Sequence, residues 1–254
     1  MMMDLLRRFR PQSPSTEASG GTRLGPVWDF HCHLLPAVDD GLRSLEETRA
    51  AIAGLRALGY QGAVLTPHIY PGVYDNNPDQ LRDVFRALRQ EIEGEFRLHL
   101  AAEYFADATL FTAMEREDIL YLELGSQKIV LVEFPTLMPT PEGVDVLLQL
   151  HRAGYQPVLA HVERYRYVQL EQSIWLPRLE RSGAWLQCDI GSLAGQYGPH
   201  PQAFARALLD QALPMLWGTD LHRVAQLERY VEPGLAVLAK SGHHINAVLE
   251  ALAA

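Results

Sequence analysis

The chain of 254 residues is 48% hydrophobic and 21% charged, a composition typical of a globular protein that buries a sizeable core. Its formal net charge of −9 argues against a general nucleic-acid binder, because such proteins usually carry a basic face. The two cysteines are too few for a disulfide framework, and no apolar run approaches the roughly 18–20 residues that span a bilayer, so we expect a cytoplasmic protein without membrane insertion.

Residues 1–24 are expected to form a flexible leader before a single domain over residues 25–254. Residues 11–22 are rich in Ser, Pro and Gly, which is typical of a mobile segment. The basic stretch LLRRFR follows a very short apolar run, whereas a secretory signal places its charges before a longer one. We interpret this stretch as a frayed terminus, with a small docking helix as the alternative.

From Val27 onward, short apolar runs alternate with helix-like segments. The expected strands are Val27–His31, Ala63–Thr66, Arg97–Ala102, Ile129–Glu133, Pro157–His161, Trp185–Ile190 and Pro214–Gly218. The expected helices are Leu45–Leu58, Gln80–Glu93, Asp107–Glu117, Glu142–Ala153, Trp175–Ser182, Pro201–Ala212, Pro233–Lys240 and His243–Leu252. This alternation predicts an α/β fold with a parallel sheet, and the number of units favours a closed or nearly closed (β/α) barrel over a small open sheet.

Metal-binding side chains follow six of the seven expected strands. They occur in DFHCH and the DDG after it, and in TPH, AAE, VEFP, AH and GTDLH. Barrels of this kind carry their chemistry at the C-terminal ends of the strands. Residues i and i+2 of a strand share a face, so His31 and His33 converge, as do Asp220 and His222.

A metal cluster explains this pattern better than independent polar residues do. One histidine near a strand end is usually an ordinary polar residue, but that explanation would have to hold at six strand ends. Mixed nitrogen and oxygen ligands suit Zn, Mn or Fe better than Ca or Mg, and there are more ligands than one ion can use. The remaining histidines are interpreted as structural: His99, His151, His200, His243 and His244.

The strings DFHCHLLPAVDDG, TPH, AAE, LVEFP, AHVERY and GTDLH, in this order, resemble the PHP (polymerase and histidinol phosphatase) superfamily. Within it, the chain is most similar to the CpsB/YwqE-type protein-tyrosine phosphatases of capsule and exopolysaccharide operons, from about Trp28 to Arg223. The resemblance implies a distorted (β/α)7 barrel with two to three divalent metal ions, Mn first and Fe or Zn as alternatives. The implied substrate is the tyrosine-phosphorylated tail of a bacterial tyrosine kinase that regulates polysaccharide synthesis.

The resemblance also implies which side chains hold each ion. The implied ligands are His31, His33, Glu103 and Asp220 for the first ion, Glu103, Glu133 and His161 for the second, and His68, His222 and Asp40 for the third. Asp40 is preferred over its neighbour Asp39, since either acidic residue of the DDG could serve.

Two arginines are expected to bind the phosphate group. Arg164, three residues after His161, matches the arginine with which the family holds phosphate, and a planar guanidinium can grip two oxygens at once. A second family arginine has no counterpart, because Leu227 occupies its place. Arg223 is our choice to replace it, with Arg229 as the alternative.

The sixth expected strand provides no clear ligand. Asp189 lies near a position where the family tends to carry Asn, and we interpret it as either orienting a ligand histidine or capping the strand end.

Two other functions use the same residues. One is a histidinol-phosphate or other small-molecule phosphatase, which differs only in loops around the cluster. The other is a non-catalytic PHP scaffold, although such modules tend to lose ligands and here every expected position is filled. A cysteine-dependent phosphatase is not expected, because the C-x5-R loop of that class is absent.

Overall fold

The structure is a computed structural model that describes residues 28–92, 96–211, 216–241, 246 and 249. The expected leader over residues 1–24 and most of the expected helix His243–Leu252 lie outside these residues. Within the described part, no helix is both long and apolar enough to cross a membrane.

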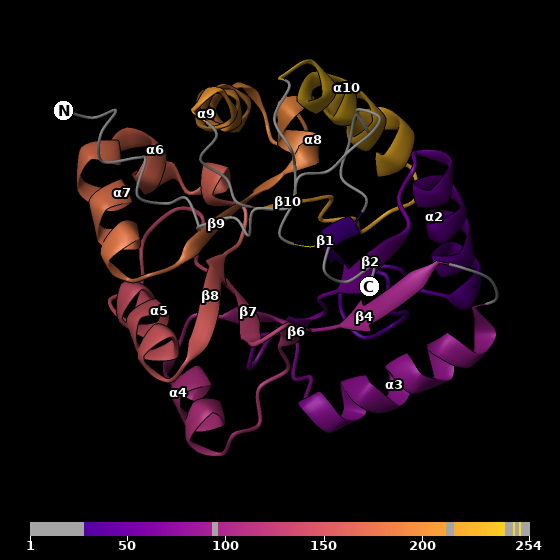
Figure 1. The fold of residues 1–254 in the computed structure, drawn as a ribbon, viewed down its shortest axis with the longest axis horizontal. Coiled ribbons are helices and arrows are strands. Elements are labelled where there is room, and N and C mark those ends of the chain that lie inside the picture. Colours follow the sequence, from indigo (N-terminus) through magenta and orange to yellow (C-terminus); the bar gives the residue numbers. More distant parts are fainter. Residues whose placement is uncertain (1–27, 93–95, 212–215, 242–245, 247–248, 250–254) are drawn as a thin grey trace.

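Parallel strands form the wall of a barrel and follow one another around it in chain order (Figure 1). They are β1 (Trp28–Cys32), β2 (Gly62–Leu65) with its continuation β3 (His68–Ile69), β4 (Arg97–Leu100) with its continuation β5 (Glu103–Phe105), β7 (Gln127–Glu133), β8 (Tyr155–Leu159), β9 (Trp185–Asp189) and β10 (Leu216–Gly218). A short strand, β6 (Leu122–Leu124), pairs antiparallel with the beginning of β7.

The wall closes where the segment after β10 returns to β1. Cys32 and Leu221 form a parallel bridge. The backbone N–H of Asp220 donates to the carbonyl of His31 at 2.8 Å, and that of His33 donates to the carbonyl of Leu221 at 3.1 Å. The expected distorted barrel is therefore confirmed, and the seven strands predicted from sequence form its wall.

The interruption between β2 and β3 falls at Pro67. This residue has no N–H to donate to a neighbouring strand, but its carbonyl accepts a hydrogen bond from the N–H of Glu103 at 3.0 Å. Beyond the interruption, His68 is in register with Glu103, and Phe105 with Glu133. The short strands β3 and β5 therefore bring chemically active residues of three neighbouring strands to one end of the barrel.

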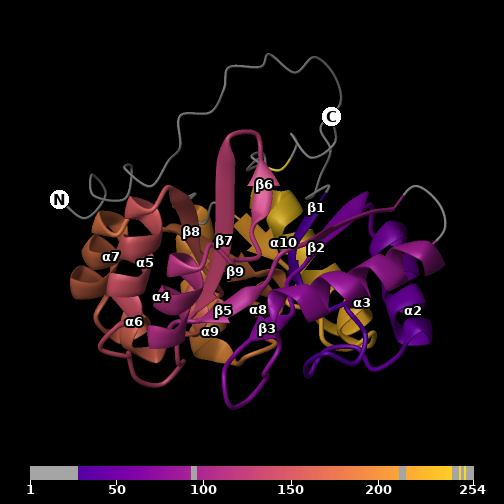
Figure 2. The same cartoon turned by 90° about the horizontal axis from the view of Figure 1, so that it is seen from below.

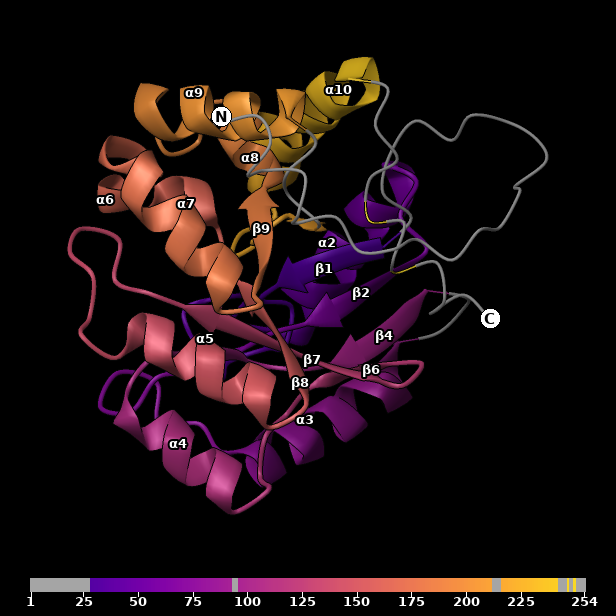
Figure 3. The same ribbon diagram turned by 60° about the vertical axis from the view of Figure 1, so that its left-hand side comes forward.

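Helices cover the outside of the barrel, and Figure 3 shows α5, α7 and α9 outside β8 and β9. The helices are α2 (Leu45–Ala57), α3 (Pro78–Glu91), α4 (Ala108–Glu115), α5 (Gly143–Arg152), α6 (Arg166–Leu170), α7 (Gln172–Arg181), α8 (Ile190–Leu193), α9 (Pro199–Asp210) and α10 (Glu232–Ser241), with the turns η2 (Val162–Arg164) and η3 (Leu227–Val231). The side chains of Ser44, Asn77 and Asp107 cap the first turns of α2, α3 and α4 by accepting backbone N–H groups.

Two apolar clusters fill the molecule. The larger one lies between the strands and the helices. The smaller one gathers buried side chains from strands on all sides, including Trp28, Val64, Leu131 and Val158, so it fills the barrel interior. His99 lies against Trp28, with ring centroids 5.3 Å apart, in agreement with the expected packing role. The apolar filling occupies one end of the barrel and leaves the other to polar residues.

Figure 2 shows the two ends of the barrel. The β6–β7 hairpin extends at one end, and the loop that follows β3 lies at the opposite end. Because all strands of the wall are parallel, the loops that follow them share that second end. This is the end at which the sequence predicted the chemistry.

Candidate metal centre

The expected ligands meet at the carboxyl end of the barrel. Their nitrogen and oxygen atoms form three groups in which all atoms lie within 4.8 Å of one another. The first ligand group is His31, His33, Glu103 and Asp220, the second is His68, Glu103 and Glu133, and the third is His33, Asp40, His68 and His222. His161 lies outside these groups, but its Nε2 is 2.9 Å from Oε1 of Glu103.

The first ligand group is completely enclosed. Nε2 of His31 lies 3.2 Å from Nε2 of His33, 3.1 Å from Oε2 of Glu103 and 3.4 Å from Oδ1 of Asp220. Nε2 of His33 lies 3.4 Å and 3.3 Å from the same two oxygens. Two nitrogens and two carboxylate oxygens thus face one small space away from water.

The second ring nitrogen of His33 binds Asp39 instead of the first ligand group. Its Nδ1 donates to Oδ2 of Asp39 at 2.8 Å, so the lone pair of Nε2 faces the first ligand group. Asp39 also accepts the N–H groups of His68 and Gly41. Asp39 therefore orients a ligand histidine, whereas its neighbour Asp40 points Oδ1 to the rings of the third ligand group.

These donors fit divalent metal ions. Facing acceptor atoms repel one another unless a cation lies between them, and a buried carboxylate is costly without a partner. Burial alone lowers the pKa of His31, but the charges of Glu103 and Asp220 outweigh it and raise that pKa to about 9. The group therefore attracts positive charge, which a proton or a divalent ion supplies. Mixed imidazole and carboxylate ligands suit Zn, Mn or Fe.

Glu103 connects the ligand groups. Its Oε2 lies 3.2 Å from Nδ1 of His68, and its Oε1 receives the bond from His161. Burial raises the pKa of Glu103, but His31 and His68 outweigh that effect and hold the pKa well below its usual range. A carboxylate with both oxygens among imidazoles has the arrangement of a bridging ligand, the role that the family resemblance implies for Glu103.

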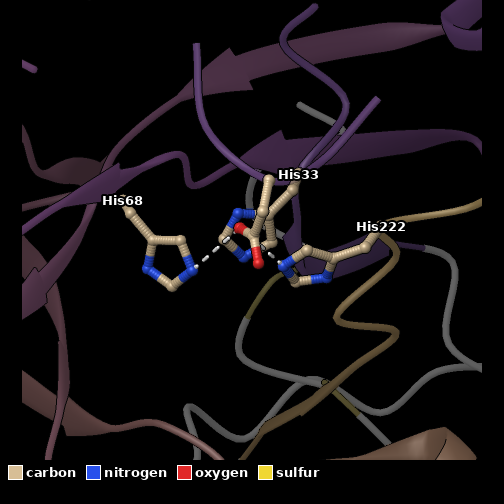
Figure 4. Close-up of side chains that lie close together, drawn as sticks. His33, His68 and His222 are labelled. Atoms are coloured by element: carbon tan, nitrogen blue, oxygen red, sulfur yellow. Dashed lines mark ion pairs between the residues drawn. The ribbon is translucent and has the colours of Figure 1, made fainter. Parts of the chain in front are cut away.

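His68 stands between the second and third ligand groups. Its Nδ1 lies 3.1 Å from Oε1 of Glu133, and its Nε2 lies 3.5 Å from Oδ1 of Asp40. The same Asp40 oxygen is 3.4 Å from Nε2 of His222. Figure 4 shows His33 between His68 and His222. Asp40, with a side chain 47% exposed, marks the side on which the centre opens to solvent.

Two residues of the centre have a backbone conformation that only glycine adopts easily. His161 has φ 31° and Asp220 has φ 48°. Such values cost free energy in non-glycine residues and concentrate at functional sites. The bend at Asp220 lets this residue and His222 continue from β10 toward the cluster.

Two glycines of the motifs make room for ligand histidines. A Cβ atom on Gly218 would lie 2.5 Å from the Cβ of His31, and one on Gly41 would lie 2.5 Å from the Cβ of His33. Neither distance is compatible with a side chain. These contacts explain the glycines of GTDLH and DDG.

The two expected arginines differ in position. Nη1 of Arg164 donates to Oδ2 of Asp220 at 2.8 Å, and its guanidinium stacks on the ring of Tyr197, so Arg164 borders the centre. Nη1 of Arg223 donates to the backbone carbonyls of Asp40, Gly41 and His222. Arg223 therefore ties two ligand loops together, a contact that the sequence did not suggest.

Leu227 is buried, and its Cδ1 occupies the space above Gly54 of α2. This position packs a helix and does not face the centre. Arg229, the alternative to Arg223, lies over the ring of Tyr230. The family's second arginine therefore has no direct substitute at either place.

Sequence reasoning assigned no role to two buried residues that contact the ligands. Gln187 of β9 contacts His31 and His161. Asp29 accepts hydrogen bonds from the side chain and N–H of Thr219, which fastens β1 to the segment after β10. Asp29 was visible in DFHCH, but its partner 190 positions away was not.

Asp189 contacts Gln187 and Arg164, so it lies one residue away from the ligand histidines. Its Oδ1 accepts a hydrogen bond from Nε2 of Gln187 at 3.0 Å, and its Oδ2 lies 3.5 Å from Nη1 of Arg164. Burial, with the charges of Asp220 and Glu163, raises its pKa to about 7. Asp189 lies outside the three ligand groups.

Known proteins are similar to this chain over most of its length. A sequence model of the family described as capsular polysaccharide synthesis, CpsB/CapC, matches residues 27–247. The tyrosine-protein phosphatase YwqE of Bacillus subtilis is 32% identical, over 84% of this chain and 84% of that protein. The tyrosine-protein phosphatase CpsB of Streptococcus pneumoniae is 23% identical, over 84% and 89%.

Solved structures agree with these matches. One match is a crystal structure from a study of YwqE from Bacillus subtilis and CpsB from Streptococcus pneumoniae, described as unique metal-dependent tyrosine phosphatases. Its TM-score is 0.69 and its sequence identity 28%, over 84% of this chain and 86% of that one. A histidinol phosphate phosphatase from Lactococcus lactis matches with a TM-score of 0.55 and 14% identity, over 86% and 94%. The second match shows a shared fold only.

Proposed function

The chain belongs to the CpsB/CapC family of capsular polysaccharide synthesis, and from this membership we infer that it is a metal-dependent protein-tyrosine phosphatase. The observation that carries this conclusion is that the three ligand groups lie at one end of the barrel, two of them sharing Glu103, with the guanidinium of Arg164 beside them. Metal ligands and a phosphate-binding cation thus lie at the same end of the barrel. A non-catalytic scaffold has no need for such a complete set.

We assign the ligands as follows. The first ion would be held by His31, His33, Glu103 and Asp220, the second by Glu103, Glu133 and, in place of His68, His161, and the third by Asp40, His68 and His222. We propose Mn for these positions, with Fe or Zn as alternatives. Asp39 is excluded as a ligand in this assignment because its Oδ2 is occupied by His33 and the N–H of His68.

The chemistry is hydrolysis of a phosphate monoester. Divalent ions held by these residues would supply an activated water molecule as the nucleophile and would neutralise charge on the phosphate oxygens and the leaving group. The chain's own residues hold the substrate. Arg164 approaches the cluster with a planar guanidinium that can bind two phosphate oxygens, and its stacking on Tyr197 fixes its plane. Arg223 keeps the loops of Asp40 and His222 together.

We propose that the substrate is phosphotyrosine in the tail of a bacterial tyrosine kinase that acts in capsule or exopolysaccharide synthesis. The open side of the centre at Asp40 and His222 would admit a phosphorylated side chain from a flexible segment. A cytoplasmic location is part of this proposal, because the kinase tail would be met there.

Phosphate release from a phosphotyrosine peptide tests the function. Activity is expected with Mn²⁺ and should be lost on chelation, and the peptide should be hydrolysed faster than histidinol phosphate. Faster turnover of histidinol phosphate would favour the small-molecule alternative. Metal-loaded protein that hydrolyses neither compound would favour the scaffold.

A further inference from the structure

Strand β9 provides no metal ligand, yet one of its side chains contacts two of them. Gln187 is completely buried. Its Oε1 accepts a hydrogen bond from the backbone N–H of His161 at 2.7 Å and lies 3.3 Å from Nδ1 of His31. One amide oxygen therefore connects β9 to a ligand histidine on β1 and to another after β8.

The orientation of this amide is fixed by its neighbours. The N–H of His161 can only donate, so the amide oxygen must face it. The amide nitrogen confirms this orientation, because Nε2 of Gln187 donates to the carbonyl of Cys188 at 2.7 Å and to Oδ1 of Asp189 at 3.0 Å. All contacts of the side chain are satisfied in this orientation.

A fixed amide also selects the tautomer of His31. Because Oε1 accepts, Nδ1 of His31 must carry the proton, and the lone pair of Nε2 then points into the first ligand group. His33 has the same tautomer, with the proton on Nδ1, because that nitrogen donates to the carboxylate of Asp39. The two histidines of the first ligand group therefore donate from Nδ1 to different acceptors, His31 to a neutral amide and His33 to a charged carboxylate.

The same oxygen supports the backbone at His161. This residue has the left-handed conformation described above, which costs free energy. The bond from its N–H to Gln187 holds the peptide at that bend, and Nε2 of the ring then reaches Glu103. Without an acceptor at this place, a buried N–H would lose its partner.

We propose that Gln187 is a positioning residue for the metal centre, which sets the tautomer of His31 and holds the turn that presents His161. The inference rests on the proposed metal-dependent function. It concerns metal binding alone and does not depend on which phosphate ester is hydrolysed.

Two substitutions separate positioning from packing. Gln187→Met keeps the length of the side chain and removes every hydrogen bond. Gln187→Glu keeps an acceptor oxygen for His31 and His161, and in the protonated form that burial favours it also keeps a donor toward Asp189. Gln156→Met is the matched control. Gln156 is the second residue of β8, at the other end of the barrel, and its Nε2 also donates to two carbonyls, those of Pro157 and Gly183. Each protein is loaded with Co²⁺, and its visible spectrum and retention of the ion against a chelator are measured.

Positioning predicts an order of metal retention. Gln187→Met should bind Co²⁺ about 10–100-fold more weakly with a changed spectrum, the range found for partners of metal-binding histidines. Gln187→Glu should stay near the unsubstituted protein, as should Gln156→Met. Equal retention by Gln187→Met, or weaker retention by Gln187→Glu than by Gln187→Met, would overturn the proposal.

If Gln187→Met does not fold, a Co²⁺ spectrum of Gln187→Glu like that of the unsubstituted protein supports the proposal, and a different one overturns it. Failure of the proposed function shows itself separately, because the unsubstituted protein would then bind no metal ion or leave phosphotyrosine intact.

Discussion

Nη1 of Arg164 lies 2.8 Å from Oδ2 of Asp220, and the other oxygen of the same carboxylate belongs to the first ligand group. The hydroxyl of Tyr197 donates to this Oδ2 at 3.1 Å. The Cζ atom of Arg164 lies 4.3 Å from the centroid of the Tyr197 ring, so the guanidinium stacks on it. One carboxylate thus joins the arginine to the expected metal position. A phosphate group bound by Arg164 would be held directly beside the ions.

Arg164→Lys should weaken phosphate binding without loss of metal. Lysine keeps the charge but cannot offer two parallel N–H groups or stack on Tyr197 in the same way. Loss of a hydrogen bond to a charged group, about 1.5–3 kcal/mol, corresponds to a fall of roughly 10–100-fold in kcat/KM for a phosphotyrosine peptide. Arg166→Lys, at an exposed position two residues on, is the control. An unchanged kcat/KM in Arg164→Lys would remove this residue from substrate binding.

The two aspartates of the DDG should respond differently to substitution. Asp40→Ala should reduce the number of ions bound at saturation, because its oxygen faces His68 and His222. Asp39→Ala should leave that number unchanged and weaken metal affinity about 10–100-fold, because it supports His33 without being a ligand. Elemental analysis and chelator competition measure both quantities. The reverse pattern would make Asp39 the ligand.

Thr219→Val should destabilise the metal-free protein more at pH 8 than at pH 5. Burial raises the pKa of Asp29 to about 6, although the hydrogen bonds from Thr219 lower it. The folded pKa exceeds the unfolded value of about 3.9, so stability falls as pH rises between them. Removing the hydroxyl of Thr219 deprives the ionised Asp29 carboxylate of a donor and raises its pKa in the folded protein further. The loss of stability between low and high pH therefore becomes larger.

The measurement is the free energy of unfolding in urea with excess chelator. Thr48→Val is the control, since Thr48 is equally buried but its hydroxyl donates to the carbonyls of Leu34 and Ser44, which do not titrate. Its cost should be the same at both pH values. If the two substitutions showed the same pH dependence, Asp29 would not be the titrating group.

Neither cysteine should matter for hydrolysis. Cys32 and Cys188 are completely buried, and burial raises the pKa of both thiols, so neither is available as a thiolate. Cys32→Ser, which keeps a donor for the carbonyl of Val64, should retain kcat/KM within about twofold, whereas His33→Ala should abolish activity. Loss of activity in Cys32→Ser with His33→Ala active would point to a cysteine nucleophile.

The sequence revealed the residues of the centre because strand ends are local features. The apolar runs before His31, Glu133 and His161 indicate where each strand stops, and parallel strands in a barrel end on the same side. The ligands can therefore be placed at one end of the barrel without any knowledge of their distances. The glycine of GTDLH could also be found from sequence, but its reason, the Cβ of His31, could not.

Contacts between residues on opposite strands of the barrel could not be predicted from the local sequence pattern. The partners of Gln187 lie on two other strands, and the packing of Leu227 on Gly54 depends on how α2 meets η3. Strands β3 and β5 were missed because two or three residues give no periodic pattern. The left-handed backbone at His161 could not be predicted from the residue type, because most histidines have a negative φ.

The most direct test of the account is phosphate release from a tyrosine-phosphorylated peptide by the purified protein, with its metal content measured in the same sample. A metal-dependent phosphatase should contain two to three bound ions per chain, be active with Mn²⁺, lose activity and ions together on chelation, and recover when Mn²⁺ is returned. Hydrolysis of phosphotyrosine that continues after the ions have been removed would contradict it.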